Sequence, residues 1–430
     1  MKFHSLNNPT EKVSFKDAVV AGIAPDKGLY FPERITPLPA PFFENIASLS
    51  NQGIAFKAIH QFVSEDVTDT QLRSILERVL DFDFPVVDIE DNVGTLELFH
   101  GPTMAFKDVG ARFMANCLGC FSKEGEEVTV LVATSGDTGG AVANGFLGVE
   151  GVKVVILYPS GKVSEIQEKQ LTTLGRNIKA IEVDGTFDDC QTMVKTAFLD
   201  KDITTSKKLT SANSINVARW LPQLFYFLFA YKQAKMQHKE IVFSIPSGNF
   251  GNLCAGMVAQ RLGMPVNHFI AATNINDTVP QFMASGSYRP KPSSATISNA
   301  MDVGDPSNFI RIRHLYHNDF ELLAKNLSSY AFDDDTTKQA MKSVYKKTGY
   351  VMDPHGAVGY LGLKKYQETH ANTYGIFLET AHPVKFLDVV ENNLDITLEI
   401  PPRIKSIMGK EKVATQIATY GELKSILKDS

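Results

Sequence analysis

VTVLVATSGDTGG (residues 128–140) joins a β-branched apolar run to a glycine-rich loop. The run is continuously apolar, which is typical of a strand buried on both faces of a sheet. Similar runs follow at 152–159, 178–185, 241–248 and 268–276, and helical stretches lie between them. This alternation of strands and helices predicts parallel α/β layers.

The pattern recurs on both sides of about residue 210, which predicts an α/β fold with two doubly wound parallel-sheet domains. The first 95 residues are mixed in character and rich in proline, as in FPERITPLPAPFF, and indicate a largely helical region with few strands. We therefore expect an N-terminal region over 1–95, a smaller α/β domain over 96–210 and a larger α/β domain over 211–430.

Composition and charge argue against several classes of protein. The 430 residues carry 43 basic and 48 acidic side chains, a net charge of −5, without any block of like charge. We therefore expect neither nucleic acid nor a membrane as a partner. The N-terminus lacks a signal-peptide pattern, and the apolar run at 221–231 is about half of a membrane span, which predicts a cytoplasmic protein.

The four cysteines form no disulfide framework. Cys117 and Cys120 make a CxxC pair, but no second pair of cysteines or histidines completes a zinc site. Burial on a helix is the favoured interpretation of this pair, and we predict no metal.

Two glycine-rich loops follow predicted strands, at the place where open α/β sheets bind ligands. The first is TSGDTGG (134–140) and the second is SGNFGN (247–252). In both, glycines let the backbone approach a ligand, and the helix that follows offers free N–H groups to a carboxylate or phosphate. The second loop has neither Walker A nor GxGxxG spacing, which argues against an NTPase. Either loop alone is also compatible with an ordinary strand–helix turn.

Lys107 lies in FHGPTMAFKD (99–108), where Gly101 and Pro102 predict a turn and a helix is expected from about Ala105. A helix N-terminus and apolar neighbours both disfavour the ammonium form of a lysine. A lysine that can lose its proton is what covalent chemistry with an aldehyde requires. The alternative for this residue alone is a solvated surface lysine.

Two further motifs carry polar side chains. One is ETAHPVKF (379–386), after an apolar run, and the other is SANSINVARW (211–220). The second motif places Asn213, Ser214 and Arg219 on one turn and the start of a helix, a set of donors suited to an oxyanion. A capped helix with a surface arginine is the plainer alternative.

Together, the five motifs resemble those of the threonine synthase family, in its longer form with an extended N-terminal region. The resemblance runs from KGLYFPE (27–33) to HPVKF (382–386), and only Met104 and Val384 depart slightly from the expected residues. It implies the tryptophan synthase β-like fold of type II pyridoxal-phosphate enzymes. The smaller domain would then carry the lysine and the SGDTG loop, and the larger domain the cofactor-phosphate loop.

The resemblance also implies roles for single residues. Lys107 would be the catalytic residue and would hold pyridoxal 5'-phosphate covalently, with Thr380 facing the pyridine nitrogen and Asp137 near the 3' oxygen. The cofactor phosphate would be bound by Gly248, Asn249, Phe250, Gly251 and Asn252. The substrate carboxylate would be bound by Ser135, Gly136 and Thr138, and the substrate phosphate by Asn213, Ser214 and Arg219.

The implied reaction converts O-phospho-L-homoserine and water to L-threonine and phosphate, in a chain that works as a monomer or homodimer. Two alternatives stay open. A serine/threonine dehydratase would share the lysine and the glycine loop but needs no second phosphate site. A non-catalytic protein that binds a phosphorylated ligand would need no reactive lysine.

Overall fold

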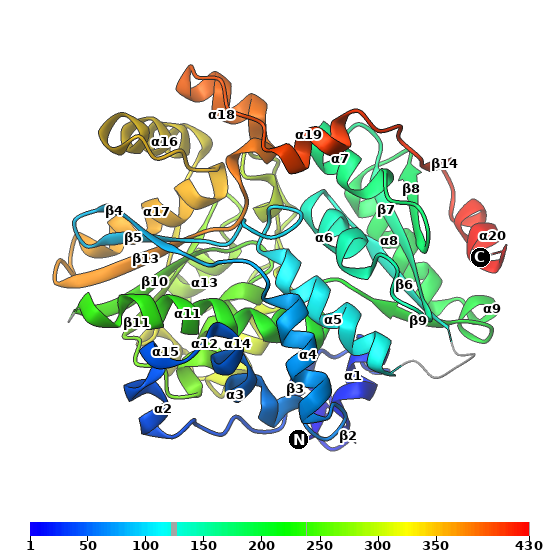
Figure 1. Cartoon of the computed structure of the whole chain (residues 1–430), viewed down its shortest axis with the longest axis horizontal. Coiled ribbons are helices and arrows are strands. Elements are labelled where there is room, and N and C mark those ends of the chain that lie inside the picture. The colour runs from blue at the N-terminus through cyan, green and yellow to red at the C-terminus, as the bar shows by residue number, and fades with distance from the viewer. Residues whose placement is uncertain (122–126, 238, 430) are drawn as a thin grey trace.

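The computed structural model describes residues 1–121, 127–237 and 239–429. Within these residues the strands form a six-stranded sheet, a five-stranded sheet and a small three-stranded sheet. Figure 1 shows the two larger sheets side by side with helices around each, and the N-terminal helices gathered below.

The six-stranded sheet has the strand order β12-β11-β10-β13-β5-β4, and all neighbouring strands are parallel except β5 and β4. Its strands are β4 (Val86–Glu90), β5 (Val93–Glu97), β10 (Glu240–Pro246), β11 (His268–Thr273), β12 (Leu327–Ala331) and β13 (Thr373–Glu379). The helices associated with it are α10 (Val217–Trp220), α11 (Leu224–Ala234), α12 (Gly251–Arg261), α13 (Thr278–Ser285), α14 (Phe309–Leu315), α15 (Phe320–Ala324), α16 (Asp334–Thr348) and α17 (Pro354–Gln367).

The five-stranded sheet has the order β14-β8-β7-β6-β9 and is parallel throughout. Its strands are β6 (Val128–Ala133), β7 (Val152–Pro159), β8 (Ile178–Val183), β9 (Lys208–Ser211) and β14 (Thr415–Ile417). The helices associated with it are α5 (Lys107–Phe121), α6 (Asp137–Phe146), α7 (Glu165–Thr172), α8 (Phe187–Leu199), α9 (Lys201–Thr204) and α20 (Tyr420–Asp429).

Both faces of the five-stranded sheet are buried along its central strands, which explains why β6 and β7 are mostly apolar. Along β6, Val130 and Val132 belong to one hydrophobic cluster, whereas Leu131 and Ala133 belong to another that includes residues of α8 and α20. Since neighbouring residues of a strand point to opposite faces, apolar residues are favoured at consecutive positions. The predicted strands at 128–134, 152–159, 178–185, 241–248 and 268–276 are confirmed, and so is the parallel α/β class.

The N-terminal region is largely helical, as predicted, and adds the three-stranded antiparallel sheet. Its elements are β1 (Phe3–Ser5), β2 (Lys12–Val13), α1 (Phe15–Ala21), β3 (Tyr30–Pro32), α2 (Ala40–Glu44), α3 (Asn51–Val63) and α4 (Asp69–Val79). Short 3-10 turns occur here and elsewhere: η1 (Ile46–Ser48), η2 (Leu221–Gln223), η3 (Lys235–Gln237), η4 (Asn299–Met301) and η5 (Pro383–Phe386).

The predicted domain boundaries stay a prediction, but each large sheet takes strands from outside the range expected for it. Strand β4 lies within 1–95 and pairs with β5 in the six-stranded sheet. At the other end of the chain, α18 (Leu387–Leu394) and α19 (Pro402–Met408) lead to β14, which pairs with β8 in the five-stranded sheet. The C-terminal segment therefore passes from one sheet to the other, as Figure 1 shows in orange and red.

Candidate active site

The five motifs all follow the carboxyl ends of parallel strands. Strands β10, β13 and β5 are consecutive in the six-stranded sheet, and they lead into the motifs at 247–252, 379–386 and 99–108. Strands β6 and β9 are neighbours in the five-stranded sheet, and they lead into the motifs at 134–140 and 211–220. Because the carboxyl ends of parallel strands share an edge, each sheet presents its motifs together.

The segment before Lys107 is held against the motif that contains Thr380. The Phe106 N–H donates to the Thr380 carbonyl at 2.8 Å, and the His382 N–H donates to the Met104 carbonyl at 3.1 Å. Between these two bonds, residues 105 and 381 form an isolated antiparallel bridge. The bridge fixes Lys107, the first residue of α5, beside the buried Thr380.

Lys107 is partly buried, and its Nζ lies 5.7 Å from the centre of the Phe106 ring. Burial, the largest effect, lowers the pKa of Lys107 to about 8. The Asp137 carboxylate opposes this shift, whereas the cationic Arg219 and Lys385 reinforce it. Near neutral pH about a tenth of the amine is therefore neutral, against fewer than about one in a thousand for an ordinary lysine.

The SGNFGN loop packs closely against neighbouring backbone. A Cβ on Gly248 would lie 2.8 Å from the Ala300 carbonyl oxygen, so no larger residue fits. Phe250 has a left-handed backbone (φ 60°), and α12 begins at the next residue, Gly251. The first N–H groups of a helix have no acceptor within it, so this turn offers amides to an anion.

Two asparagine side chains hold this loop in place. Asn252 Nδ2 donates to the Pro246 carbonyl at 3.0 Å, and its Oδ1 accepts from the Leu253 N–H at 2.9 Å. Asn249 Oδ1 accepts from the Ser307 N–H at 2.6 Å. The resemblance implies that both residues bind the cofactor phosphate, which stays a prediction; in the structure both side chains form hydrogen bonds that support the loop.

The motif at 211–220 meets the SGNFGN loop directly. Asn249 Nδ2 donates to Ser214 Oγ at 2.7 Å, which joins a motif of one sheet to a motif of the other. Asn213 Nδ2 is 3.5 Å from the Ala133 carbonyl, at the end of β6. Arg219 is buried and bonds the Ala212 carbonyl through Nη1, whereas its Nε has no hydrogen-bond partner among the described residues. A buried donor without a partner suits an anionic ligand.

The SGDTG loop is shaped by glycine and by one threonine. Gly136 has φ 142°, and a Cβ there would lie 2.5 Å from the amide of Gln167. Thr134 Oγ1 accepts from the N–H groups of Gly136 and Gly139 at 3.0 and 2.8 Å. This turn leaves Ser135 and Thr138 partly exposed at the N-terminus of α6.

Asp137 is buried and forms an ion pair that the sequence interpretation did not assign. Its Oδ1 lies 2.6 Å from Lys385 Nζ and accepts a hydrogen bond from Gln167 Nε2 at 3.1 Å. Burial would raise the pKa of Asp137, but the charges of Lys385 and Lys107 outweigh burial and hold it well below its usual range. The only sequence signal for Lys385 was its place among apolar residues in the motif at 379–386.

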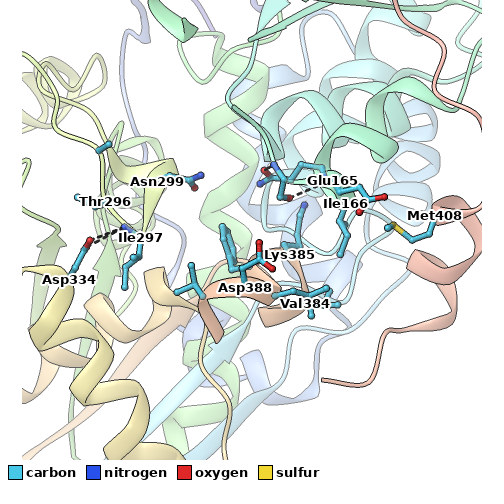
Figure 2. Close-up of a pocket in the computed structure, with 16 residues that line it drawn as sticks. Glu165, Ile166, Thr296, Ile297, Asn299, Asp334, Val384, Lys385, Asp388 and Met408 are labelled. Atoms are coloured by element: carbon cyan, nitrogen blue, oxygen red, sulfur yellow. Dashed lines mark hydrogen bonds between the residues drawn. The ribbon is translucent and has the colours of Figure 1, made fainter. Parts of the chain in front are cut away.

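A pocket of about 510 Å³ opens beside this ion pair. Gln167 and Lys385 line it, together with Glu165, Asp334 and Asp388. Figure 2 shows Lys385 and Asp388 near its centre and Glu165 on the α7 side. Among the described residues, none of those predicted to bind cofactor or substrate lines this pocket, which adjoins the ion pair through Lys385 and Gln167.

Comparison with known proteins decides the family. Family models match residues 95–375 (pyridoxal-phosphate dependent enzyme), 2–80 (threonine synthase N terminus) and 356–426 (threonine synthase, C-terminal). Threonine synthase of Escherichia coli K12 is 44% identical over 405 residues, which cover 94% of each chain. The chain belongs to the threonine synthase family.

Solved threonine synthases share the whole fold. The crystal structure of threonine synthase from Escherichia coli has a TM-score of 0.93 at 41% identity and covers 100% of both chains. The pyridoxal-phosphate-bound threonine synthase of Brucella melitensis has a TM-score of 0.94 at 30% identity and covers 100% of this chain and 99% of that one. The predicted family and type II fold are confirmed, in preference to the dehydratase and binding-protein alternatives.

The threonine synthase family depends on pyridoxal phosphate, as predicted, and the residues of this chain fit that group. The backbone turn at Gly248 and the start of α12 suit the phosphate. Lys107, with its lowered pKa, suits the aldehyde. The uncharged Thr380, fixed beside Lys107 by the bridge described above, suits a ring nitrogen.

Proposed function

We propose that this threonine synthase converts O-phospho-L-homoserine and water into L-threonine and phosphate. The observation that carries the proposal is the contact between two anion-binding motifs, made by Asn249 Nδ2 and Ser214 Oγ. One motif offers the amides at the start of α12, and the other offers the buried Nε of Arg219. A substrate with its own phosphate needs both sites, whereas serine or threonine would leave the second one unused.

Lys107 is proposed as the catalytic residue. Its Nζ would hold the cofactor and, once the substrate amine has replaced it there, would be free as a neutral amine to take the proton from the substrate Cα. A pKa of about 8 keeps this neutral form populated near neutral pH. When bound, pyridoxal phosphate supplies an electron sink for the negative charge that develops on the substrate.

The other motifs are proposed to bind and orient the substrate. Ser135, Gly136 and Thr138 bind its carboxylate at the N-terminus of α6. Asn213, Ser214 and Arg219 bind its phosphate and guide it away as the leaving group. Holding both ends of the substrate fixes the Cα–H bond relative to Lys107. Binding then supplies the orientation that the proton transfer requires.

The remaining roles concern the cofactor. The proposal assigns its phosphate to the backbone of residues 248–252, its ring nitrogen to Thr380 and its 3' oxygen to the neighbourhood of Asp137. Asn249 and Asn252 then act by supporting the loop, which agrees with their hydrogen bonds.

We also propose a cytoplasmic enzyme that acts as a monomer or homodimer on a small molecule, without nucleic acid or membrane as partner. The balanced charge along the chain supports this. Of the helices in the described residues, none has the length and apolar character to cross a bilayer.

The test is turnover with purified protein, pyridoxal phosphate and O-phospho-L-homoserine. We expect phosphate and threonine in equal amounts, and no ammonia when threonine is supplied instead. Lys107→Ala should abolish both products and the covalent link that borohydride would otherwise fix at position 107. Ammonia from threonine without phosphate release from phosphohomoserine would overturn the proposal in favour of a dehydratase.

A further inference from the structure

Lys385 is a buried cation whose hydrogen bonds connect three of the motifs. Its side chain is 0% exposed, and its Nζ lies 2.6 Å from Asp137 Oδ1 and donates to the Thr103 carbonyl at 2.9 Å. Asp137 begins α6 beside the five-stranded sheet, Thr103 precedes Lys107, and Lys385 follows β13 of the six-stranded sheet. A buried ion pair of this kind is costly to break, because one charge is left without a partner.

The ion pair decides where the Asp137 carboxylate is directed. Its Oδ1 is bonded by both Lys385 Nζ and Gln167 Nε2. Among the described residues no carboxylate forms an ion pair with Lys107 Nζ, although Asp137 is close enough to act on its charge. Without Lys385, the carboxylate would lose its ion-pair partner, and Lys107 is a second cation whose charge acts on it.

The charged groups that act on Lys107 come from three other elements. They are Asp137 at the start of α6, Arg219 in α10 and Lys385 in η5. On its own helix, the Asp108 carboxylate is already bonded by the N–H and hydroxyl of Thr103. The phenol of Tyr226, from α11, donates to the carbonyl of Phe106. Of these two carboxylates, Asp137 is the one that forms an ion pair with Lys385.

We propose that Lys385 is a positioning residue that neutralises Asp137 and thereby prevents this carboxylate from holding Lys107 in its protonated form. The inference rests on the proposed function, in which Lys107 reacts as a neutral amine. It assigns to Lys385 an effect on reactivity through Asp137, without contact to the substrate. Lys385 acts in addition as a tie between the motifs of the two sheets.

The experiment measures the protonation of Lys107 in the full chain freed of cofactor. Trace acetic anhydride labels amines only in their neutral form, and mass spectrometry of the peptide that contains Lys107 gives the labelling rate at each pH. In Lys385→Met we expect the midpoint of this profile to rise by at least one pH unit, and labelling at pH 7 to fall about tenfold. Lys385→Arg, which keeps the charge, should keep the profile of the unaltered protein.

A double variant separates the charge effect from a loss of packing. Lys385→Met combined with Asp137→Asn removes both charges, and we expect its profile to return to that of the unaltered protein or lie below it. Lys169→Met is the matched control, since Lys169 also donates to a carbonyl across the molecule, that of Lys410 at 2.6 Å, but does not face Asp137. Its profile should not change.

The proposal is overturned if Lys385→Met leaves the Lys107 profile unchanged. It is also overturned if the double variant keeps the raised midpoint, because the effect would then not come from the Asp137 charge. The measurement needs neither cofactor nor substrate. A failure of phosphohomoserine turnover would therefore count against the proposed function alone, and a flat labelling result would count against Lys385 alone.

Discussion

Two lysines of this site differ in their partners. Lys385 has no exposed side-chain surface and is compensated by the Asp137 carboxylate at 2.6 Å. Lys107 is without an ion-pair partner among the described residues, and burial lowers its pKa to about 8. The difference in chemistry between them is a difference in partners, because a buried amine either finds a carboxylate or loses its proton more easily.

The lowered pKa predicts a pH dependence for cofactor capture. Only the neutral amine of Lys107 adds to the aldehyde, so the addition rate should rise about tenfold per pH unit up to about pH 8 and then level off. Stopped-flow absorbance of the cofactor-free chain mixed with pyridoxal phosphate measures this rate. A midpoint near 10.4, the value of an ordinary lysine, would contradict the burial argument.

A second prediction at this scale concerns Arg219. Arg219→Met keeps most of the buried volume but removes the guanidinium, and we expect KM for phosphohomoserine to rise by about 10- to 100-fold with the cofactor still bound. Steady-state kinetics and the cofactor absorbance of the same sample measure both. Arg261→Met is the control, because Arg261 donates to the Leu315 carbonyl and should leave KM unchanged. An unchanged KM in Arg219→Met would remove this residue from the substrate site.

At the scale of elements, three helices begin at the candidate active site. α5 begins at Lys107, α6 at Asp137 and α12 at Gly251, each within one of the motifs. Their N-termini present unpaired N–H groups and partial positive charge to the site. Helix N-termini of this kind bind anions. They suit the carboxylate and phosphate of an amino-acid substrate and the phosphate of a cofactor.

Close packing of α5 against α10 predicts an effect on stability. A Cβ on Gly110 would lie 2.3 Å from the Arg219 carbonyl oxygen, so Gly110→Ala must push these two helices apart. We expect a loss of about 1–3 kcal/mol in the free energy of unfolding, measured by denaturant titration. Gly119→Ala, in the same helix, meets only the Val149 side chain at 3.4 Å and should be neutral or slightly stabilising. Equal effects of both changes would contradict the packing explanation.

At the scale of the whole molecule, the C-terminal segment ties the two sheets together. Arg403 of α19 donates to the carbonyls of residues 100 and 101, close to the Lys107 turn. Further along, Lys412 forms ion pairs with Glu168 and Glu182, and the segment then adds β14 to the five-stranded sheet. A chain end that contacts both sheets limits how far they can separate around the site.

This arrangement predicts a local loss of stability when α20 is weakened. Leu423 is fully buried in the hydrophobic cluster between α8, α20 and the five-stranded sheet, so Leu423→Ala should cost about 2–5 kcal/mol there. Hydrogen exchange should show faster exchange in β7 and β8, with protection in β10 and β11 unchanged. Ser425→Ala, an exposed change in the same helix, is the control. A uniform increase in exchange across both sheets would contradict this local effect.

The sequence was sufficient for the strands, the α/β class and the family. Runs such as 128–134 are mostly apolar because both faces of the sheet are covered, and that property is local enough to be recognised without coordinates. The glycine loops and the lysine motif are likewise contiguous, since each is a single turn between a strand and a helix. The strands, the glycine loops and the lysine motif can therefore be recognised, in their order along the chain, from residues near one another in sequence.

Only the tertiary structure decided which motifs touch. The ion pair of Asp137 with Lys385 and the bond between Ser214 and Asn249 join residues far apart in the chain. The return of β14 to the five-stranded sheet is of the same kind. Such contacts depend on how helices pack between two sheets, which no local pattern of apolar and polar residues encodes. The sequence shows only that Lys385 lies among apolar residues. The fold shows that it is buried and that the Asp137 carboxylate is its partner.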